Sequence, residues 1–183
     1  MPRSTIRRIP VILHRLSKTC RFMPKHALPV TDLRPMARCD IDTVMAIETR
    51  VYAHPWTKGI FADCLRVGYE CWIAECDGAI AGYGVLSVAA GESHVLNLAV
   101  DRPFQGRGLG RFLLGHLLQC ARRLGADTAL LEVRPSNRSA IALYEDSGFN
   151  LIGCRKNYYP GAQDREDALL YAIDLDTLHM NHD

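Results

Sequence analysis

Three glycines lie within one short segment, Gln105-Gly106-Arg107-Gly108-Leu109-Gly110, between the end of an expected strand and the start of an expected helix. Because glycine has no Cβ atom, it leaves backbone N–H groups open to an approaching anion, and a helix N-terminus adds partial positive charge. Arg102, Arg107 and Arg111 could add paired donors to phosphate oxygens. The segment therefore indicates phosphate binding, although a glycine-rich turn that only permits tight packing would have the same composition.

The spacing of these glycines disfavours two common kinds of phosphate-binding loop. The segment does not read Gly-x-x-x-x-Gly-Lys-Ser/Thr, the loop of nucleoside triphosphatases, nor Gly-x-Gly-x-x-Gly. It also comes after residue 100 and follows antiparallel strands, whereas a dinucleotide-binding fold normally opens with its glycine loop.

A lone carboxylate, Glu132, interrupts the apolar run 129–133. A carboxylate beside a protonated amine, directly or through a water molecule, can remove its proton and leave a neutral nucleophile. Glu132 is thus a candidate for proton transfer. The alternative is an acid at the end of a strand that pairs with Arg134.

Hydrophobic periodicity predicts the elements that must position these groups. Four helices are expected, beginning near Asp40 or Asp42, after a cap at Thr57, at Leu109 and near Arg138. The helix from Arg138 is expected to reach Asp146, with Ser136 or Asn137 as its cap. Strands are expected over 30–35, 71–75, 79–88, 93–100, 129–133, 149–154 and 169–175. Turns between strands are expected at Asp77-Gly78 and at Gly91-Glu92.

The order of these elements predicts one α/β domain. A strand–helix–strand crossover between residues 93 and 133 makes those two strands parallel neighbours. A chain of 183 residues suits a single core. We therefore expect a mixed sheet of six or seven strands, flanked by four helices, over residues 30–176. A basic N-terminal extension, 1–29, and a short tail, 177–183, complete the chain.

Several segments together resemble one known family. The glycine loop is similar to the coenzyme A pyrophosphate loop of the GNAT family of N-acetyltransferases. The whole set, from about Val30 to Leu175, is similar to the RimI-type ribosomal-protein alanine N-acetyltransferases. It comprises segments 97–101, 105–110, 131–137, 140–149, 155–159 and 165–168. The resemblance implies a GNAT fold, acetyl-CoA as the acetyl donor, and the N-terminal alanine of the eighteenth small-subunit ribosomal protein as the acceptor.

The resemblance also implies roles for individual residues. Glu132 matches the general base, and Tyr144 matches the general acid that protonates the leaving coenzyme A thiolate. Tyr144 could equally be a half-buried aromatic residue that pins its helix to the sheet, and Asn137 could be only a helix cap. The residues that match cofactor-binding positions are Leu98, Ala99, Val100, Gly106, Arg107, Gly108, Leu109, Gly110, Arg111 and Asn137.

The acceptor side is implied by aromatic residues from two segments. Those that match the peptide groove are Tyr52, Pro55, Trp56, Tyr158 and Tyr159. The acidic residues Asp164, Glu166 and Asp167 would suit a basic peptide, or would form a solvated charge run. Acetylation of lysine side chains or of a small amine remains an alternative, as does a non-catalytic module that senses acetyl-CoA or binds the ribosome. The presence of both Glu132 and Tyr144 favours an enzyme.

Composition and charge bear on nucleic-acid contact, membrane association, metal sites and the cellular compartment. The net charge is +2, but residues 1–29 hold seven Lys and Arg and no acid. This arm could touch RNA or an acidic surface, or could be a disordered tail or an over-extended start before Met23. There is no apolar run of the roughly 18 residues that a bilayer requires, so no membrane association is expected. Seven scattered cysteines without a Cys-x-x-Cys pair argue against a metal site and fit a reducing cytoplasm.

Overall fold

The computed structural model describes residues 32–161 and 164–176, so the predicted arm, 1–29, and tail, 177–183, lie outside the described residues. Within the described part, seven strands form one mixed sheet in the order β1-β2-β3-β4-β5-β7-β6, and four α-helices flank it. The predicted α/β architecture is therefore confirmed. No helix of this part is long and apolar enough to cross a membrane.

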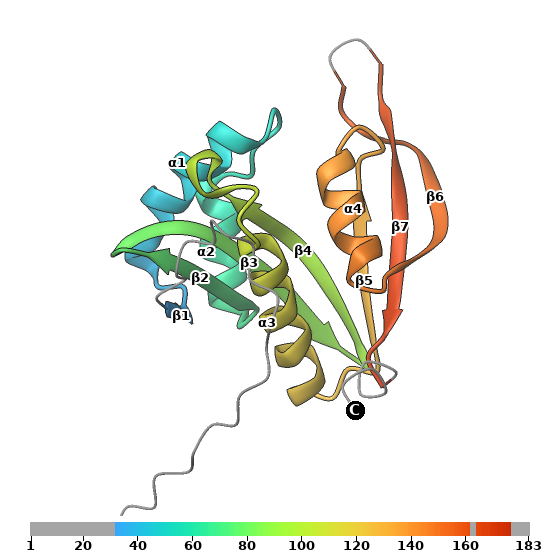
Figure 1. The fold of residues 1–183 in the computed structure, drawn as a ribbon, viewed down its shortest axis with the longest axis horizontal. Coiled ribbons are helices and arrows are strands. Elements are labelled where there is room, and N and C mark those ends of the chain that lie inside the picture. Colours follow the sequence, from blue (N-terminus) through green and yellow to red (C-terminus); the bar gives the residue numbers. More distant parts are fainter. Residues whose placement is uncertain (1–31, 162–163, 177–183) are drawn as a thin grey trace, which may run out of the picture.

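The elements form two groups, one on each side of the β4–β5 junction (Figure 1). The first group contains β1 (Asp32–Pro35), α1 (Ile41–Val51), α2 (Lys58–Val67), β2 (Glu70–Cys76), β3 (Ala79–Ala89) and β4 (Glu92–Val100). The second contains α3 (Leu109–Arg123), β5 (Thr128–Val133), α4 (Arg138–Asp146), β6 (Asn150–Tyr159) and β7 (Glu166–Asp174). Two short 3-10 helices, Arg38–Asp40 and Arg102–Phe104, precede α1 and the glycine loop.

Helix caps and a glycine place several helix boundaries at the residues where the sequence predicts them. The Thr57 side chain accepts the Ile60 N–H at the start of α2, and the Asn137 side chain accepts the Ala140 N–H at the start of α4. Both are N-caps, which satisfy donors that the first helical turn leaves unpaired. Gly148, with φ of 93°, follows α4.

Several predicted boundaries are wrong, among them the start of β7, which lies at Glu166 rather than at Leu169. The turn after β3 consists of Ala90 and Gly91, with φ of 53° and 82°, and Glu92 already pairs with Ala89 as the first residue of β4. Strand β6 does not end at Cys154 but continues to Tyr159. Its extension pairs again with β7 beyond an irregularity at 155–159, so the partner strand, rather than local hydrophobicity, determines its length.

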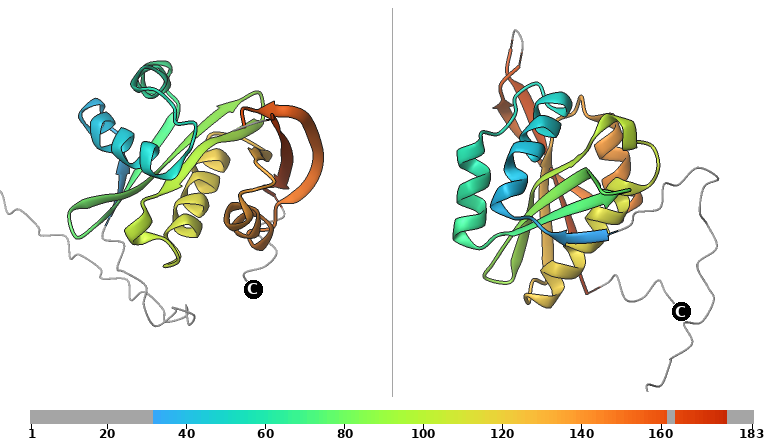
Figure 2. Two further views of the ribbon diagram at one scale, coloured as in Figure 1. Left: turned by 90° about the horizontal axis from the view of Figure 1, so that it is seen from above. Right: turned by 90° about the vertical axis from the view of Figure 1, so that its left-hand side faces the viewer.

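Helices cover both faces of the sheet. Helices α1 and α2 lie on one face, and α3 and α4 lie on the other (Figure 2). Helix α3 approaches the sheet closely because β3 carries glycines beneath it. A Cβ atom at Gly82 would lie 3.1 Å from the Leu113 side chain of α3, and one at Gly84 would lie 2.7 Å from the Leu117 side chain. Leu117 itself is fully buried in the core cluster that joins α3 to β5, α4 and β7.

The two central strands separate part of the way along the sheet. Strands β4 and β5 are parallel, as predicted, but pair only through Glu92–Val95 and Thr128–Leu131. A bulge then leaves Leu96 without a partner, since Val95 pairs with Leu86 and Asn97 with Val85. Bulges bend and twist the strand that carries them. Beyond the bulge β4 stays with β3 and β5 stays with β7, so the two strands diverge (Figure 1).

Candidate active site

A cavity of about 490 Å³ lies where β4 and β5 diverge. One side is formed by the end of β4 and the glycine loop, and the other by the first two turns of α4. The predicted cofactor residues that line it are Leu98, Ala99, Val100, Gly106, Gly108, Leu109, Gly110 and Asn137. The structure therefore brings together eight of the ten residues that the sequence assigned to the donor.

The glycine loop has the backbone geometry of an anion site. Gly106 and Gly108 have φ of 72° and 86°, and no atom lies within 4 Å of a Cβ atom built at either position. The positive φ, rather than crowding, is therefore what requires glycine here. Gly108 is the N-cap of α3 and supplies no side-chain cap. The first N–H groups of α3 thus remain available to an anion such as a pyrophosphate.

Two predicted cofactor residues, Arg107 and Arg111, do not line this cavity. The Arg111 guanidinium lies 2.9 Å from the Asp146 carboxylate, and both side chains are exposed. Arg102, from the segment before the loop, does line the cavity. The Gln105 side chain donates to the Val100 carbonyl at 2.8 Å and so ties the loop to the end of β4.

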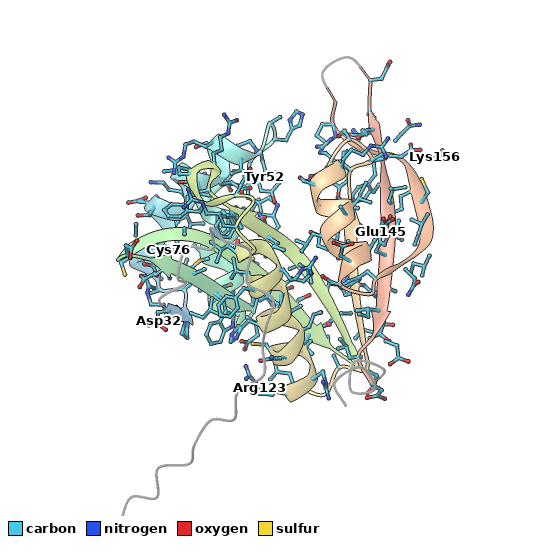
Figure 3. The ribbon with its side chains drawn as sticks, viewed as in Figure 1. Asp32, Tyr52, Cys76, Arg123, Glu145 and Lys156 are labelled. Carbon is cyan, nitrogen blue, oxygen red and sulfur yellow. The ribbon has the colours of Figure 1, made fainter. Side chains whose placement is uncertain are left out.

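A second cavity, of about 290 Å³, adjoins the first. Its lining includes Glu132 from the end of β5. Four residues line both cavities, namely Tyr52, Leu98, Asn137 and Tyr144. The Tyr52 hydroxyl donates to the Leu98 carbonyl at 2.7 Å, which fixes the boundary between the two cavities. Figure 3 shows Tyr52 on the side of the first group of elements that faces β5 and α4.

The Glu132 carboxylate does not pair with Arg134. Its side chain is 26% exposed, and Arg155 of β6 lies 3.1 Å from it through Nε. The Tyr158 side chain hydrogen-bonds to the same carboxylate, and this bond raises the pKa of Tyr158. Arg134 instead pairs with Glu166 at 3.1 Å. The predicted alternative for Glu132 was therefore right about an ion pair and wrong about its partner.

Tyr144 lies at the junction of the two cavities. It is buried, and its ring packs against Phe149 at 5.8 Å between centroids. Burial raises the pKa of Tyr144 to about 12, so the phenol keeps its proton near neutral pH. None of the described residues hydrogen-bonds to its hydroxyl. The residue therefore packs α4 against Phe149 and also lies on the lining of both cavities.

The predicted acceptor residues are only partly brought together. Tyr52, Trp56 and Tyr159 line the second cavity, whereas Pro55 and Tyr158 do not. Pro55 is exposed, and Tyr158 packs edge-on against Tyr159 at 5.0 Å between centroids.

The acidic residues of β7 are neither a free acidic surface nor a solvated run. Glu166 accepts from Arg134 and from the Ser136 N–H, and Asp167 accepts from Lys156 and from the Asn157 N–H. These contacts lower the pKa of Asp167, with the Lys156 hydrogen bond as the largest cause. Both carboxylates therefore hold the β6–β7 hairpin in place.

Two residues of the second cavity, Glu48 and Asn97, are not predicted as site residues from the sequence. Both line the second cavity, together with His54, and both are buried. A signal was present, because Glu48 lies one helical turn after Val44 on the buried face of α1, where an apolar residue is expected. Across 32–161 and 164–176, no three His, Cys, Asp or Glu side chains gather as metal ligands.

Comparison with known proteins gives the family. Residues 41–149 match the model of the acetyltransferase (GNAT) family. The ribosomal-protein bS18-alanine N-acetyltransferase of Salmonella typhimurium is 40% identical over 140 residues, which are 76% of this chain and 95% of that protein. The crystal structure of the ribosomal-protein-S18-alanine N-acetyltransferase from Escherichia coli superimposes with a TM-score of 0.74 and 38% identity, covering 79% of this chain and 93% of the other.

A more distant structure shares the fold and contains the donor. It is yncA of Salmonella typhimurium with its cofactor acetyl-CoA, at a TM-score of 0.68 and 20% identity, covering 79% of this chain and 94% of the other. The family match, the identity and the site geometry agree. The chain belongs to the acetyltransferase (GNAT) family, in its branch of ribosomal-protein alanine N-acetyltransferases.

Proposed function

We propose that this protein transfers the acetyl group of acetyl-CoA to the N-terminal α-amine of ribosomal protein bS18, at its alanine. The observation that carries the proposal is that Tyr52, Leu98, Asn137 and Tyr144 line both cavities. A donor in the cavity of the glycine loop and an acceptor in the cavity of Glu132 would meet at these four residues.

The donor cavity supports acetyl-CoA through its backbone. The first N–H groups of α3 and the open glycine loop suit the pyrophosphate. Leu98, Ala99 and Val100 have no β5 partner. Apart from the Leu98 and Val100 carbonyls, which accept from Tyr52 and Gln105, this edge of β4 can hydrogen-bond to an extended ligand. Because Arg111 already pairs with Asp146, we assign the pyrophosphate mainly to these backbone groups.

The acceptor cavity supports direct transfer. Glu132 accepts a proton from the α-ammonium group of the acceptor, whose ordinary pKa near 8 leaves it mostly protonated at neutral pH. Arg155 and Tyr158 fix the orientation of this carboxylate. The neutral amine then attacks the acetyl carbonyl, and the C–S bond breaks as Tyr144 gives its phenolic proton to the leaving thiolate. The second proton that the nitrogen loses restores the Tyr144 phenol, and Glu132 releases its proton to solvent.

The remaining assignments follow from this chemistry. Residues 30–176 form the catalytic domain, and the arm, 1–29, lies outside it. The cytoplasm is where such an acceptor is made, and the six cysteines of the described residues are all free thiols there.

The proposal is tested with the Glu132→Gln variant and a bS18 peptide that begins with alanine. We expect acetylation to fall by about 10²-fold while acetyl-CoA binding is kept, because the amide cannot accept the proton. Glu92→Gln, an exposed carboxylate outside both cavities, is the matched control. Mass spectrometry locates the acetyl group. Modification of lysine side chains alone, or of no peptide group at all, would contradict the proposal.

A further inference from the structure

The acceptor cavity contains a second carboxylate that comes from α1. Glu48 is 1% exposed and lies in the cavity lining near Tyr52 and Trp56. A buried carboxylate is energetically costly unless hydrogen bonds or a cation compensate for the lost water. Its partners therefore indicate what it does.

Three elements supply hydrogen-bond donors to Glu48. The Trp56 N–H, in the segment between α1 and α2, donates at 2.8 Å. The Asn97 side-chain amide of β4 lies 3.4 Å from each carboxylate oxygen. The Tyr83 hydroxyl of β3 also donates to it. Glu48 thus connects the acceptor segment to the two strands beneath it.

Among the described residues, no Lys, Arg or His forms an ion pair with Glu48. Glu132, by contrast, pairs with Arg155, and Asp101 pairs with Arg50. Burial raises the pKa of the Glu48 carboxyl, and the bonds from Trp56 and Asn97 oppose that rise.

Other titratable groups face the same space. Burial is the main cause of the raised pKa of Tyr52, and the nearby Glu48 carboxylate adds to it. His54, Glu132, Arg134, Tyr144 and Tyr159 complete the titratable lining of the cavity. Arg134, the only permanent cation among them, is engaged with Glu166. A negative charge on Glu48 is therefore free to act on whatever enters.

We propose that Glu48 is a positioning residue that holds the acceptor segment in place and makes the cavity select acceptors that enter as α-ammonium ions. This inference rests on the proposed function, because it concerns the same acceptor amine. Attraction between opposite charges is stronger beside a buried carboxylate than in bulk water. The same attraction makes the ammonium proton harder to remove, so the charge of Glu48 favours binding and does not assist transfer.

The test compares two peptides that differ only at the first residue. One is the bS18 peptide with its α-amine, and the other carries a hydroxyl group in place of that amine. Calorimetric titration of the full chain gives the affinity of each. We expect the wild type to prefer the amine, and Glu48→Gln to reduce this preference by about tenfold, by weakening only the amine peptide. The KM of the amine peptide should rise while kcat is unchanged or higher.

Two further variants separate charge from structure. Glu48→Asp keeps the charge and should keep the preference, even if the protein melts at a lower temperature. Glu92→Gln removes an exposed carboxylate and should leave both affinities unchanged. Equal weakening of both peptides by Glu48→Gln would overturn the inference, since that is what a purely structural role predicts. Failure of the wild type to bind either peptide would instead contradict the proposed acceptor, and this inference with it.

Discussion

At the scale of single residues, Tyr144 has a packing role and, in the proposed mechanism, a chemical role. Its ring packs against Phe149, and the residue lines both cavities. Burial disfavours the phenolate and so keeps the proton in place. A general acid must hold its proton until the leaving group develops charge, and this environment provides that.

The Tyr144→Phe variant should therefore lose activity and keep its fold. We expect kcat to fall by about 10²-fold, since the ring contacts stay and only the proton donor is lost. Because burial raises the pKa of Tyr144 to about 12, the wild-type kcat should not decline between pH 8 and pH 10 through ionisation of this phenol. Steady-state kinetics over that range and circular dichroism check both points. Tyr69→Phe, at an exposed tyrosine, is the control. An active Tyr144→Phe enzyme would remove the residue from the mechanism.

A residue's role can be predicted from the sequence when its partners are close to it along the chain. Asn137 was predictable as a cap, because a cap is defined by neighbours along the chain. Glu132 was visible as an acid in an apolar run. Its partner was not, because the β6–β7 register, rather than sequence distance, brings Arg155 and not Arg134 to it. The role of Glu48 was concealed for the same reason, since two of its three donors, Tyr83 and Asn97, lie on strands that are distant in the sequence.

At the scale of elements, a substitution in the glycine loop tests donor binding more directly than a substitution in the helices around it. Gly108→Ala places a Cβ atom at φ of 86°, which L-residues rarely adopt, and obstructs the approach to the first N–H groups of α3. We expect the KM for acetyl-CoA to rise about tenfold or more. Gly115→Ala, inside α3, has open space around it and no positive φ. It should stabilise the protein by about 0.5 to 1 kcal/mol and leave the kinetics unchanged. Equal KM values in the two variants would show that the loop does not hold the donor.

Elements with strong end signals were predictable, and those that depend on a partner were not. Helix α4 runs over the predicted residues, because Asn137 caps it and Gly148 follows it. Strand β6 extends five residues past its predicted end at Cys154, to Tyr159. That extension is polar and exposed, and it exists because β7 offers Glu166 opposite Tyr159 and Asp167 binds the Asn157 N–H.

At the scale of the whole molecule, the core crosses the β4–β5 junction, whereas the site lies at the end of that junction where the two strands diverge. The core cluster under α3 runs without a break from β3 and β4 to β5 and β7. The diverging strands leave the other end of the β4–β5 junction without hydrogen bonds. The donor cavity occupies that end and takes its lining from both groups of elements. A bound donor would therefore connect two parts of the sheet that the backbone leaves apart.

This arrangement predicts how acetyl-CoA changes amide hydrogen exchange. At about 100 times its Kd, a ligand adds roughly 2.7 kcal/mol to the stability of the state that binds it. We expect exchange to slow by up to about 100-fold in 98–110, on the first side of the cavity, and in 137–144, on the second. Mass spectrometry of peptic fragments measures both segments at once, and Gly108→Ala should diminish both effects by the same factor. Slowing confined to 105–110 would mean that the donor binds the loop without joining the two sides of the sheet.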